Sequence, residues 1–459
     1  MKFPEGFLEH LKGIEGFDEH DFIEAHSLST IPVSIRINPL KVQNKPDNLE
    51  KVLWCDNGFY LPNRISFTFD PLFHAGCYYV QEASSMFIEH ILSQLPGLEK
   101  PVIALDLCAS PGGKTTQLIS NLNKDSLLIS NEIDRKRVMA LCDNVIRWGA
   151  NNVAVTNNHP SEIGKFHNLF DIVLVDAPCS GSGMFRKDSD SVGHWSYPHV
   201  IRSSHRQQKI LDSILPSLKE NGYLIYSTCS YSKEENEDIV EWLRDREDLE
   251  NVIISVPSQW GVVLTGSQEN QNVGYRFFPY LVKGEGFFVT VFRKKNHPSG
   301  SNFRNYPSKT NERNNAVSRL IELPDKLIIK EQGDFFATPE NYDGLVNKLQ
   351  SLGLKLIQFG LRLGQFKGKD FIPAHDLALS KINSIFCEKI EVDSSIAIAY
   401  LQGQQILPEY STDKPWKLIL YRGFGLGWLK SVAGRNNNYY PSYLRIRNSS
   451  TETNYPNLF

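Results

Sequence analysis

The strongest constraint on the fold is an alternation of short apolar runs with amphipathic stretches through the centre of the chain. The apolar runs "PVIALDLCA", "SLLISNEID", "NNVAVTN", "FDIVLVDAP" and "GYLIYSTCS" have the length of strands, and helix-like stretches such as "RKRVMALCDNVIRWG" separate them. Strands that alternate with helices of this length form a parallel, doubly wound sheet with functional residues at the carboxyl ends of its strands. The sequence therefore predicts an α/β, Rossmann-like core.

The chain has 459 residues, too many for one ordinary hydrophobic core, so we expect several domains. A small α+β module is predicted over residues 1–75, and the Rossmann-like domain over 76–295, where the run "GEGFFVTVFRKK" finishes its sheet. The polar segment 296–315, rich in Pro, Gly, Ser and Asn, is expected to be a linker. A mixed α/β middle domain over 316–389 and a strand-rich domain over 390–459 follow.

Composition excludes several classes of protein. Hydrophobic residues make up 41% and charged residues 22%, as in a globular protein, and no apolar run approaches the roughly 18 residues that cross a membrane. The first twenty residues mix acids and bases, unlike a signal peptide. The seven cysteines include no CxxC pair, which argues against a zinc cage or a disulfide framework. We therefore expect a cytoplasmic protein without a metal.

Charge is unevenly distributed along the chain. Residues 1–295 carry eight more acidic than basic residues, whereas residues 296–459 carry five more basic than acidic ones. The window from Lys414 to Arg447 holds seven basic residues and no acidic one, together with Trp416, Tyr421, Phe424, Trp428, Tyr439, Tyr440 and Tyr443. Bases interleaved with aromatic rings are typical of a surface that binds phosphates and stacks on nucleobases. A β-rich face over an aromatic core explains the same composition equally well.

The stretch "ALDLCASPGGKTTQL" predicts a strand, a tight glycine turn and the start of a helix. Gly113, Lys114 and Thr115 are only half of a P-loop motif, because Cys108 occupies the position of its first glycine. The GxGxxG pattern of dinucleotide sites is absent. An adenosyl-methionine site needs only such a turn and an acid that closes the next strand. Glu132, nineteen residues after Gly113, meets that requirement, although an ordinary turn between strand and helix remains the alternative.

Two cysteines, Cys179 and Cys229, each follow a predicted strand, and Asp176 closes the first of these strands. Carbon 5 of a pyrimidine accepts a methyl group only after a soft nucleophile has added to carbon 6, and a thiolate suits this role. An acid near N3 stabilises the adduct, and a second thiol assists its elimination. The pattern fits such chemistry, but it does not say which thiol attacks.

The motifs "DLCASPGGKTTQL", "SNEID", "DAPCSGSG" and "YSTCSYSKEENE", in this order and spacing, resemble those of the Sun/Fmu family of RNA cytosine-5 methyltransferases over residues 30–295. The resemblance implies S-adenosyl-L-methionine as cofactor, with Cys229 as nucleophile, Cys179 in release, and Asp176 and Lys114 near the reacting groups. DNA cytosine-5 methyltransferases attack instead from the position of Cys179. The cofactor-binding positions implied are Cys108, Ala109, Ser110, Pro111, Gly112, Gly113, Lys114, Glu132, Asn158 and Asp176.

Some positions depart from that family or lack a clear role. Where bacterial relatives carry an acid after the third strand, this chain has Asn158, whose amide oxygen is still expected to bond the adenine edge. Lys187 and Arg186 are expected to hold phosphates, unless they belong to a solvated loop. Arg36 and Asn38, in "SIRIN", are given no role beyond structure.

The C-terminal segments "GLRLGQFKGKDFIPAHDLAL" and "GFGLGWLKSVAGRNNNYYPSYLR" are similar to the tails of the bacterial RsmF/YebU type of this family. That similarity implies a PUA-like domain that binds structured RNA, and 16S ribosomal RNA as the substrate. We expect a monomer whose partner is RNA, with no membrane. A tRNA substrate, a non-catalytic ribosome-assembly factor and a P-loop nucleotide hydrolase are the alternatives.

Overall fold

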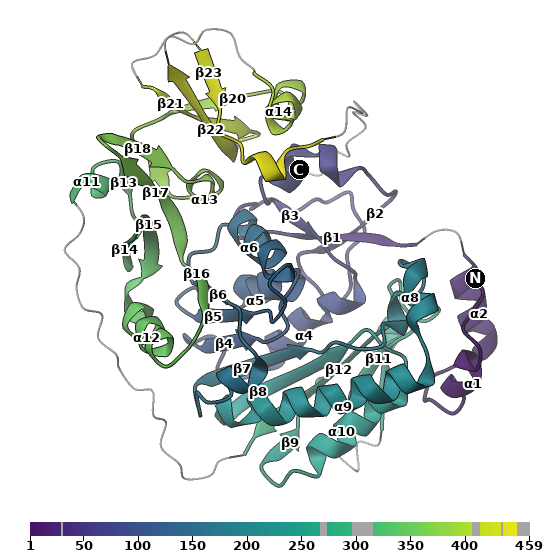
Figure 1. The fold of residues 1–459 in the computed structure, drawn as a ribbon. Coiled ribbons are helices and arrows are strands. Elements are labelled where there is room, and N and C mark those ends of the chain that lie inside the picture. Colours follow the sequence, from purple (N-terminus) through teal and green to yellow (C-terminus); the bar gives the residue numbers. More distant parts are fainter. Residues whose placement is uncertain (29–30, 267–272, 296–314, 406–413, 433–434, 448–459) are drawn as a thin grey trace.

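A mixed sheet forms the centre of the computed structural model, which describes residues 1–28, 31–266, 273–295, 315–405, 414–432 and 435–447 (Figure 1). The order along the sheet is β10 (Val263–Thr265), β11 (Gly274–Phe277), β12 (Phe287–Lys294), β8 (Leu218–Thr228), β7 (Phe170–Asp176), β4 (Ile103–Asp106), β5 (Leu127–Asn131), β6 (Val153–Thr156) and β16 (Leu356–Phe359). Strand β9 (Leu249–Asn251) pairs with β12.

The five strands from β8 to β6 run parallel, so their carboxyl ends share one edge of the sheet. Pairing places Asp176 of β7 opposite Ser227 of β8, and Asp106 of β4 opposite Ser130 of β5. Strand β12 runs antiparallel to β8, but it does not finish the sheet as expected, because β11 and β10 continue beyond it. The alternating sequence pattern thus yields the predicted α/β core.

Helices cover both faces of this sheet. One face packs against α4 (Phe87–Gln94), α5 (Gly113–Asn121) and α6 (Arg137–Trp148), and the other against α7 (Pro160–Ile163), α9 (Tyr197–Ile214), α10 (Glu237–Arg244) and α12 (Glu340–Ser351). The central strands are buried on both faces, which explains their continuous apolar runs. No helix among the described residues is both long and apolar enough to span a bilayer.

The N-terminal part divides between two places. A small antiparallel sheet contains three strands in the order β2 (Gly58–Leu61), β1 (Val33–Ile37) and β3 (Tyr78–Val80). The short helix α3 (Pro71–His74) lies between β2 and β3 in the chain. Because β3 lies past residue 75, this sheet crosses the predicted domain boundary. Helices α1 (Phe7–Leu11) and α2 (Glu19–Ser27) lie instead near α8 (Ser189–His194), beside the central sheet (Figure 1). There Phe7 and Phe22 share a hydrophobic cluster with Trp195 and Tyr231.

The middle segment is less independent than its predicted boundaries suggest. It forms a sheet of β14 (Leu327–Gln332), β15 (Asp334–Pro339), β17 (Leu361–Lys367) and β18 (Asp370–Pro373), with α11 (Asn315–Ser318), α13 (His375–Leu379) and the pair β13 (Ile321–Glu322) and β19 (Asn383–Ser384). Strand β16, however, pairs antiparallel with β6, and α12 covers the central sheet. This segment therefore extends the Rossmann-like sheet. The predicted linker up to residue 314 lies outside the described residues.

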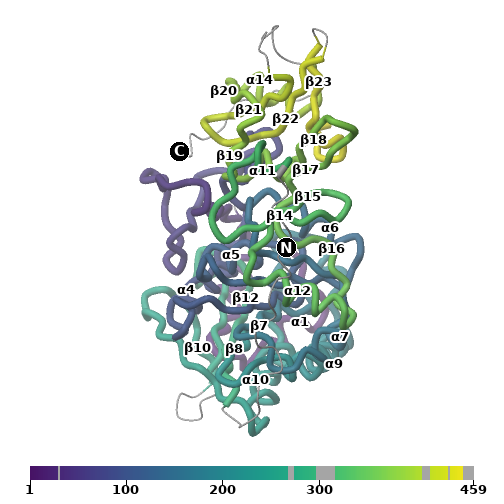
Figure 2. The backbone as a smooth tube through the Cα atoms, turned by 90° about the vertical axis from the view of Figure 1, so that its left-hand side faces the viewer, coloured from purple at the N-terminus to yellow at the C-terminus, as the bar shows by residue number. Residues whose placement is uncertain are grey.

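The C-terminal sheet consists of β20 (Glu388–Glu391), β21 (Trp416–Tyr421), β22 (Phe424–Val432) and β23 (Arg435–Asn438), with helix α14 (Ser394–Leu401). It lies at the far end of the molecule from β8 and β10 (Figure 2). Ile35 and Phe59 of the N-terminal sheet share one hydrophobic core with Ile419 and Leu429 of the C-terminal sheet. We call this shared core the terminal junction.

The aromatic window predicted as a stacking surface is largely interior. Trp416, Trp428 and Tyr440 are all at most 4% exposed and belong to hydrophobic cores, whereas Tyr439 and Tyr443 are 41% and 62% exposed. The basic residue Lys417 is also buried, near Glu388 at 3.3 Å. The core interpretation therefore explains the buried rings, and the exposed tyrosines remain as candidates for RNA contact.

Candidate active site

The two thiols singled out in the sequence face each other at the carboxyl edge of the sheet. Cys179 follows β7 and Cys229 follows β8, and their sulfur atoms lie 3.1 Å apart. The parallel pairing of these neighbouring strands produces the contact, because it brings Asp176 level with Ser227. Both cysteines are partly exposed, so a substrate can reach them.

The environment of Cys179 favours the protonated form of its thiol. Contact with the Cys229 sulfur, followed by burial, raises the pKa of Cys179 well above its usual value. A group with so high a pKa stays protonated near neutral pH. Cys179 therefore keeps its own proton, and either sulfur can be the donor of the 3.1 Å S–H···S contact.

An ion pair lies beside the thiols. The Nζ of Lys114, at the start of α5, is 2.8 Å from Oδ2 of Asp176, while Ser227 donates a hydrogen bond of 2.8 Å to Oδ1. Burial alone lowers the pKa of Lys114, but the charges of Asp176 and Cys229 outweigh it, and the net pKa is raised. Lys114 therefore carries its positive charge next to the acid and the thiols.

The glycine turn forms a cradle at the end of β4. The Ala109 N–H donates to Asn131 O at 2.8 Å, and Ser110 O accepts a hydrogen bond of 2.8 Å from Arg137. Gly112 has a φ of 113°, a conformation that favours glycine, and a Cβ added to Gly113 would lie 3.3 Å from the ring of Tyr79. The turn thus packs Ala109 and Ser110 closely at the amino end of α5, and only Pro111 within it is exposed.

Two acidic residues beside the glycine turn have carboxylate oxygens that can accept further hydrogen bonds. Asp106 is buried and accepts from Thr115 through Oδ2, whereas its Oδ1 has no hydrogen-bond partner among the described residues. Burial raises the pKa of Asp106 to about 7. Glu132, after β5, uses Oε1 to accept the Asp134 N–H at 2.9 Å, and its Oε2 lies 3.6 Å from Arg137. Acceptors beside a glycine turn fit the amino group and ribose hydroxyls of S-adenosyl-L-methionine.

Asn158, just after β6, contacts the backbone of the middle segment. Its Oδ1 accepts the Lys355 N–H at 3.1 Å, its Nδ2 donates to Lys355 O at 3.4 Å, and its own N–H donates to Asn131. Both polar atoms of the side chain therefore bind the backbone just before β16. The amide fastens the middle segment to the central sheet, and each of its two polar atoms makes one of these hydrogen bonds.

Residues of "SIRIN" support the cradle in a way that the sequence did not reveal. Arg36, fully buried on β1, donates through Nη2 to Gly113 O at 3.1 Å and to Thr116 Oγ1 at 2.6 Å, and through Nε to Gln81 at 2.8 Å. Asn38 donates to Gly76 O and Trp148 O. The N-terminal sheet therefore braces the glycine turn from outside the Rossmann-like core.

The two basic residues after the first thiol have different environments. The side chain of Arg186 is 5% exposed and lies 3.8 Å from buried Glu285, so it is structural and not available for phosphate. Lys187 is exposed and lines a groove of about 740 Å³. Arg64 and Lys283 add positive charge to that groove, which also contains Gln81, the partner of Arg36.

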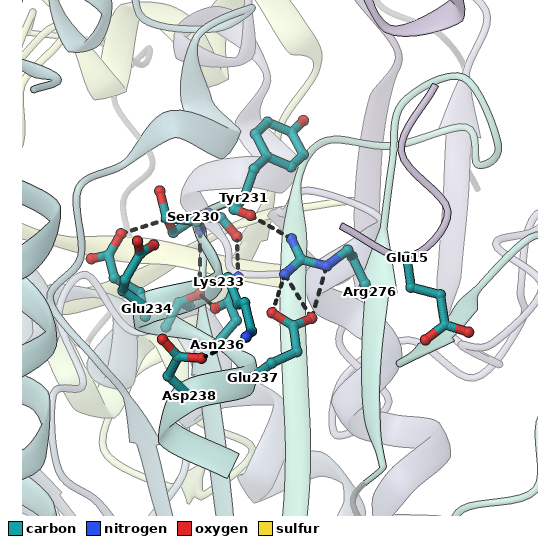
Figure 3. Close-up of polar contacts among 12 residues, drawn as sticks. Glu15, Ser230, Tyr231, Lys233, Glu234, Asn236, Glu237, Asp238 and Arg276 are labelled. Atoms are coloured by element: carbon teal, nitrogen blue, oxygen red, sulfur yellow. Dashed lines mark hydrogen bonds and ion pairs between the residues drawn. The ribbon is translucent and has the colours of Figure 1, made fainter. Parts of the chain in front are cut away.

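The motif after Cys229 holds the loop that carries this thiol (Figure 3). Asn236 accepts from Thr228 Oγ1 at 2.6 Å and donates to Ser230 O at 2.8 Å, on either side of the cysteine. Arg276 donates to Tyr231 O at 2.7 Å and forms an ion pair with Glu237 at 2.6 Å. The resemblance named this motif, but no role was predicted for these side chains.

The parallel order β6–β5–β4–β7–β8 with antiparallel β12, the glycine cradle and the flanking acids define a Rossmann-like, class I S-adenosyl-L-methionine-dependent methyltransferase. Family models agree with this class. Residues 97–293 match the 16S rRNA methyltransferase RsmB/F model, residues 3–83 the N-terminal domain of 16S rRNA methyltransferase RsmF, and residues 387–446 the methyltransferase RsmF PUA domain.

Whole-chain relatives point the same way. Proteins named ribosomal RNA small subunit methyltransferase F are similar: that of Shewanella loihica is 30% identical over 89% of this chain and 88% of its own, and that of Aeromonas salmonicida 28% identical over 96% and 97%. A solved methyltransferase homologue from Pyrococcus horikoshii is 29% identical with a TM-score of 0.54, covering 64% of this chain and 95% of its own. The chain belongs to the RsmB/F family of 16S rRNA methyltransferases.

Proposed function

We propose that this protein methylates carbon 5 of a cytosine in 16S ribosomal RNA through a transient covalent bond between Cys229 and carbon 6. The observation that carries the proposal is the 3.1 Å contact between the sulfur atoms of Cys179 and Cys229, next to the Lys114–Asp176 ion pair. The reaction requires attack at carbon 6, protonation at N3 and later elimination. Two thiols beside a charged acid are the groups that can carry out these steps.

S-adenosyl-L-methionine supplies the methyl group, and the glycine turn with Asp106 and Glu132 would hold it. The Cys229 thiolate adds to carbon 6, and electron density moves through carbon 5 and toward N3. The Lys114–Asp176 pair supplies the proton or hydrogen bond that stabilises N3 in the adduct. After methyl transfer, the bond between carbon 6 and the Cys229 sulfur breaks as the ring double bond re-forms. Cys179 gives its proton to the leaving sulfur, and the Cys179 thiolate that results takes the proton from carbon 5.

The proton on Cys179 supports this assignment of the two thiols. A thiolate, not a thiol, is the nucleophile, so the sulfur that keeps its proton is the poorer attacking group. The raised pKa of Cys179 therefore favours attack by Cys229. A protonated Cys179 is also placed to donate to the Cys229 sulfur as that sulfur leaves carbon 6.

The RNA partner is supported by the PUA-model match and by the groove that Arg64, Lys187 and Lys283 line. Relatives named for the small ribosomal subunit favour 16S RNA over tRNA as the substrate. A flipped cytosine would reach the thiols while the flanking strand lies in the basic groove. We further propose that the protein acts as a monomer in the cytoplasm.

The decisive experiment compares Cys229→Ala and Cys179→Ala on 16S RNA. Cys229→Ala removes the nucleophile, so methyl transfer should fall on the order of 10⁴-fold or more, while calorimetry shows unchanged cofactor binding. Cys179→Ala should accumulate a covalent RNA adduct, seen as a shifted band on a denaturing gel. Cys142→Ala, a buried thiol on α6, is the matched control.

Bisulfite sequencing of 16S RNA from a deletion strain identifies the modified cytosine when complementation with the wild-type gene restores it. Full activity in Cys229→Ala would overturn the proposed chemistry. Methylation of tRNA with no change in 16S RNA would overturn the proposed substrate.

A further inference from the structure

A buried carboxylate connects the two loops that carry the thiols. Glu235 is fully buried just before α10, and it touches the residue after each cysteine. Its Oε2 accepts from Ser180 Oγ and from Ser230 Oγ, both at 2.5 Å, and its Oε1 accepts the Ser180 N–H at 2.8 Å. One carboxylate therefore binds the chain immediately beyond Cys179 and immediately beyond Cys229.

The environment of Glu235 is built for a charged or strongly polar group. Gln207 of α9 donates a further hydrogen bond of 3.1 Å to Oε1, so four donors surround the carboxylate. Ser180 Oγ and Ser230 Oγ are themselves 3.1 Å apart. A buried carboxylate is costly unless donors surround it, so this arrangement commits three segments of the chain to one group.

We propose that Glu235 is a positioning residue that fixes the separation of the Cys179 and Cys229 thiols and thereby sets the rate at which the covalent RNA adduct is released. The proposal rests on the proposed function, because it assigns a step within that reaction. Glu235 acts through Ser180 and Ser230, and its role is to hold the proton of Cys179 within reach of the leaving sulfur.

The loops differ in how much they depend on Glu235. The Cys229 loop has other supports, because Asn236 binds Thr228 and Ser230 O, and Arg276 binds Tyr231 O. Next to Cys179, the Ser180 side chain is bonded only to Glu235 and Ser230 in the described part of the chain. On the other side of Cys179, Gln207 donates to Pro178 O at 3.1 Å, and Gln207 is itself bonded to Glu235. Loss of the carboxylate should therefore displace Cys179 more than Cys229. Attack should persist, and release should slow.

The test uses the full-length protein with 16S RNA and cofactor. In Glu235→Ala, a thiol displaced by about 1 Å should lower kcat about 10- to 100-fold. KM for RNA should stay within about twofold, and the covalent adduct should accumulate on a denaturing gel. Glu235→Gln keeps Oε1 for Ser180 and Gln207 and offers an NH₂ to the two hydroxyl oxygens, so it should restore most of kcat.

The matched control is Glu234→Ala. Glu234 is the preceding carboxylate, and its side chain pairs with His10 at 3.2 Å and touches neither thiol loop. It should leave kcat and the adduct fraction at the wild-type level. The proposal is overturned if Glu235→Ala releases RNA at the wild-type rate, or if kcat falls with no adduct.

A second measurement needs neither RNA nor turnover. Diamide accepts two electrons and two protons as a pair of thiols forms a disulfide, so its reaction with Cys179 and Cys229 reports how often the sulfurs meet. Oxidation should be about tenfold slower in Glu235→Ala than in the wild type or in Glu234→Ala. Equal rates would refute the positioning role even if the chain proved to have another substrate, whereas slow oxidation without RNA methylation would refute only the proposed function.

Discussion

The edge of the sheet that carries the thiols and the terminal junction are held together in different ways. At the edge, hydrogen bonds and an ion pair connect short motifs, and Cys179 and Cys229 are only fifty residues apart. At the junction, apolar side chains such as Ile35 and Leu429 meet from opposite ends of the chain. Directional polar contacts fix the positions of the reacting side chains to within a bond length. Burial of apolar side chains holds one whole domain against another. Changes at the edge should therefore alter rate, and changes at the junction should alter stability.

The substitution Lys114→Met should show the largest difference between an effect on rate and an effect on stability. The substitution keeps the length of the side chain but removes the cation beside Asp176, so methyl transfer should fall about 10²- to 10³-fold. Because the Asp176 side chain is 35% exposed, water compensates its charge, and the melting temperature should change little. Single-turnover rates and thermal unfolding measure the two quantities. An unchanged rate with a large loss of stability would reverse the comparison.

Acid should weaken the terminal junction. The rings of His74 and His375 both contact Tyr440; burial lowers the pKa of His74 to about 4 and of His375 to about 3, with the charge of Arg147 acting in the same direction. In the unfolded chain these two histidines bind protons near pH 6.5, whereas in the folded chain they do not. Their contribution to the free energy of unfolding is therefore fully present above pH 6.5 and is lost as the pH falls toward 4. The two shifts together correspond to a loss of up to about 6 kcal/mol by pH 4.

Urea unfolding at several pH values measures this loss. In the double variant His74→Asn and His375→Asn the slope of unfolding free energy against pH between 6.5 and 4 should be shallower. Parallel slopes for the variant and the wild type would show that these histidines do not carry the acid sensitivity.

The smallest effect is expected where the middle segment joins the catalytic sheet. Asn158→Ala removes two hydrogen bonds to the Lys355 backbone and should cost about 1 kcal/mol of stability. Cofactor affinity should stay within about twofold, because the amide is committed to Lys355. Calorimetric titration with the cofactor checks this, and a tenfold loss of affinity with unchanged stability would restore the adenine contact expected from the sequence.

The chemistry was easier to predict than the assembly for a physical reason. Strand periodicity and the glycine turn are local signals, so the parallel order and the approach of Cys179 to Cys229 follow from "DAPCSGSG" and "YSTCSY". The pairing of β16 with β6 joins segments about two hundred residues apart, and no local pattern records it. Likewise, nothing in the spacing of Trp416 and Trp428 distinguishes a buried ring from one that stacks on RNA. Arg36 was singled out without a functional role, because one of its partners at the glycine turn, Gly113 O, is a backbone atom.

The terminal junction also dictates an order of events during synthesis. The first eighty residues include strands whose apolar side chains find their cover on Ile419 and Leu429, more than three hundred residues downstream. At about 5–20 residues per second, a ribosome needs on the order of tens of seconds to make that stretch. Throughout this interval the nascent amino-terminal sheet exposes an apolar face. A chaperone that binds apolar surfaces can hold this face until the last strands emerge.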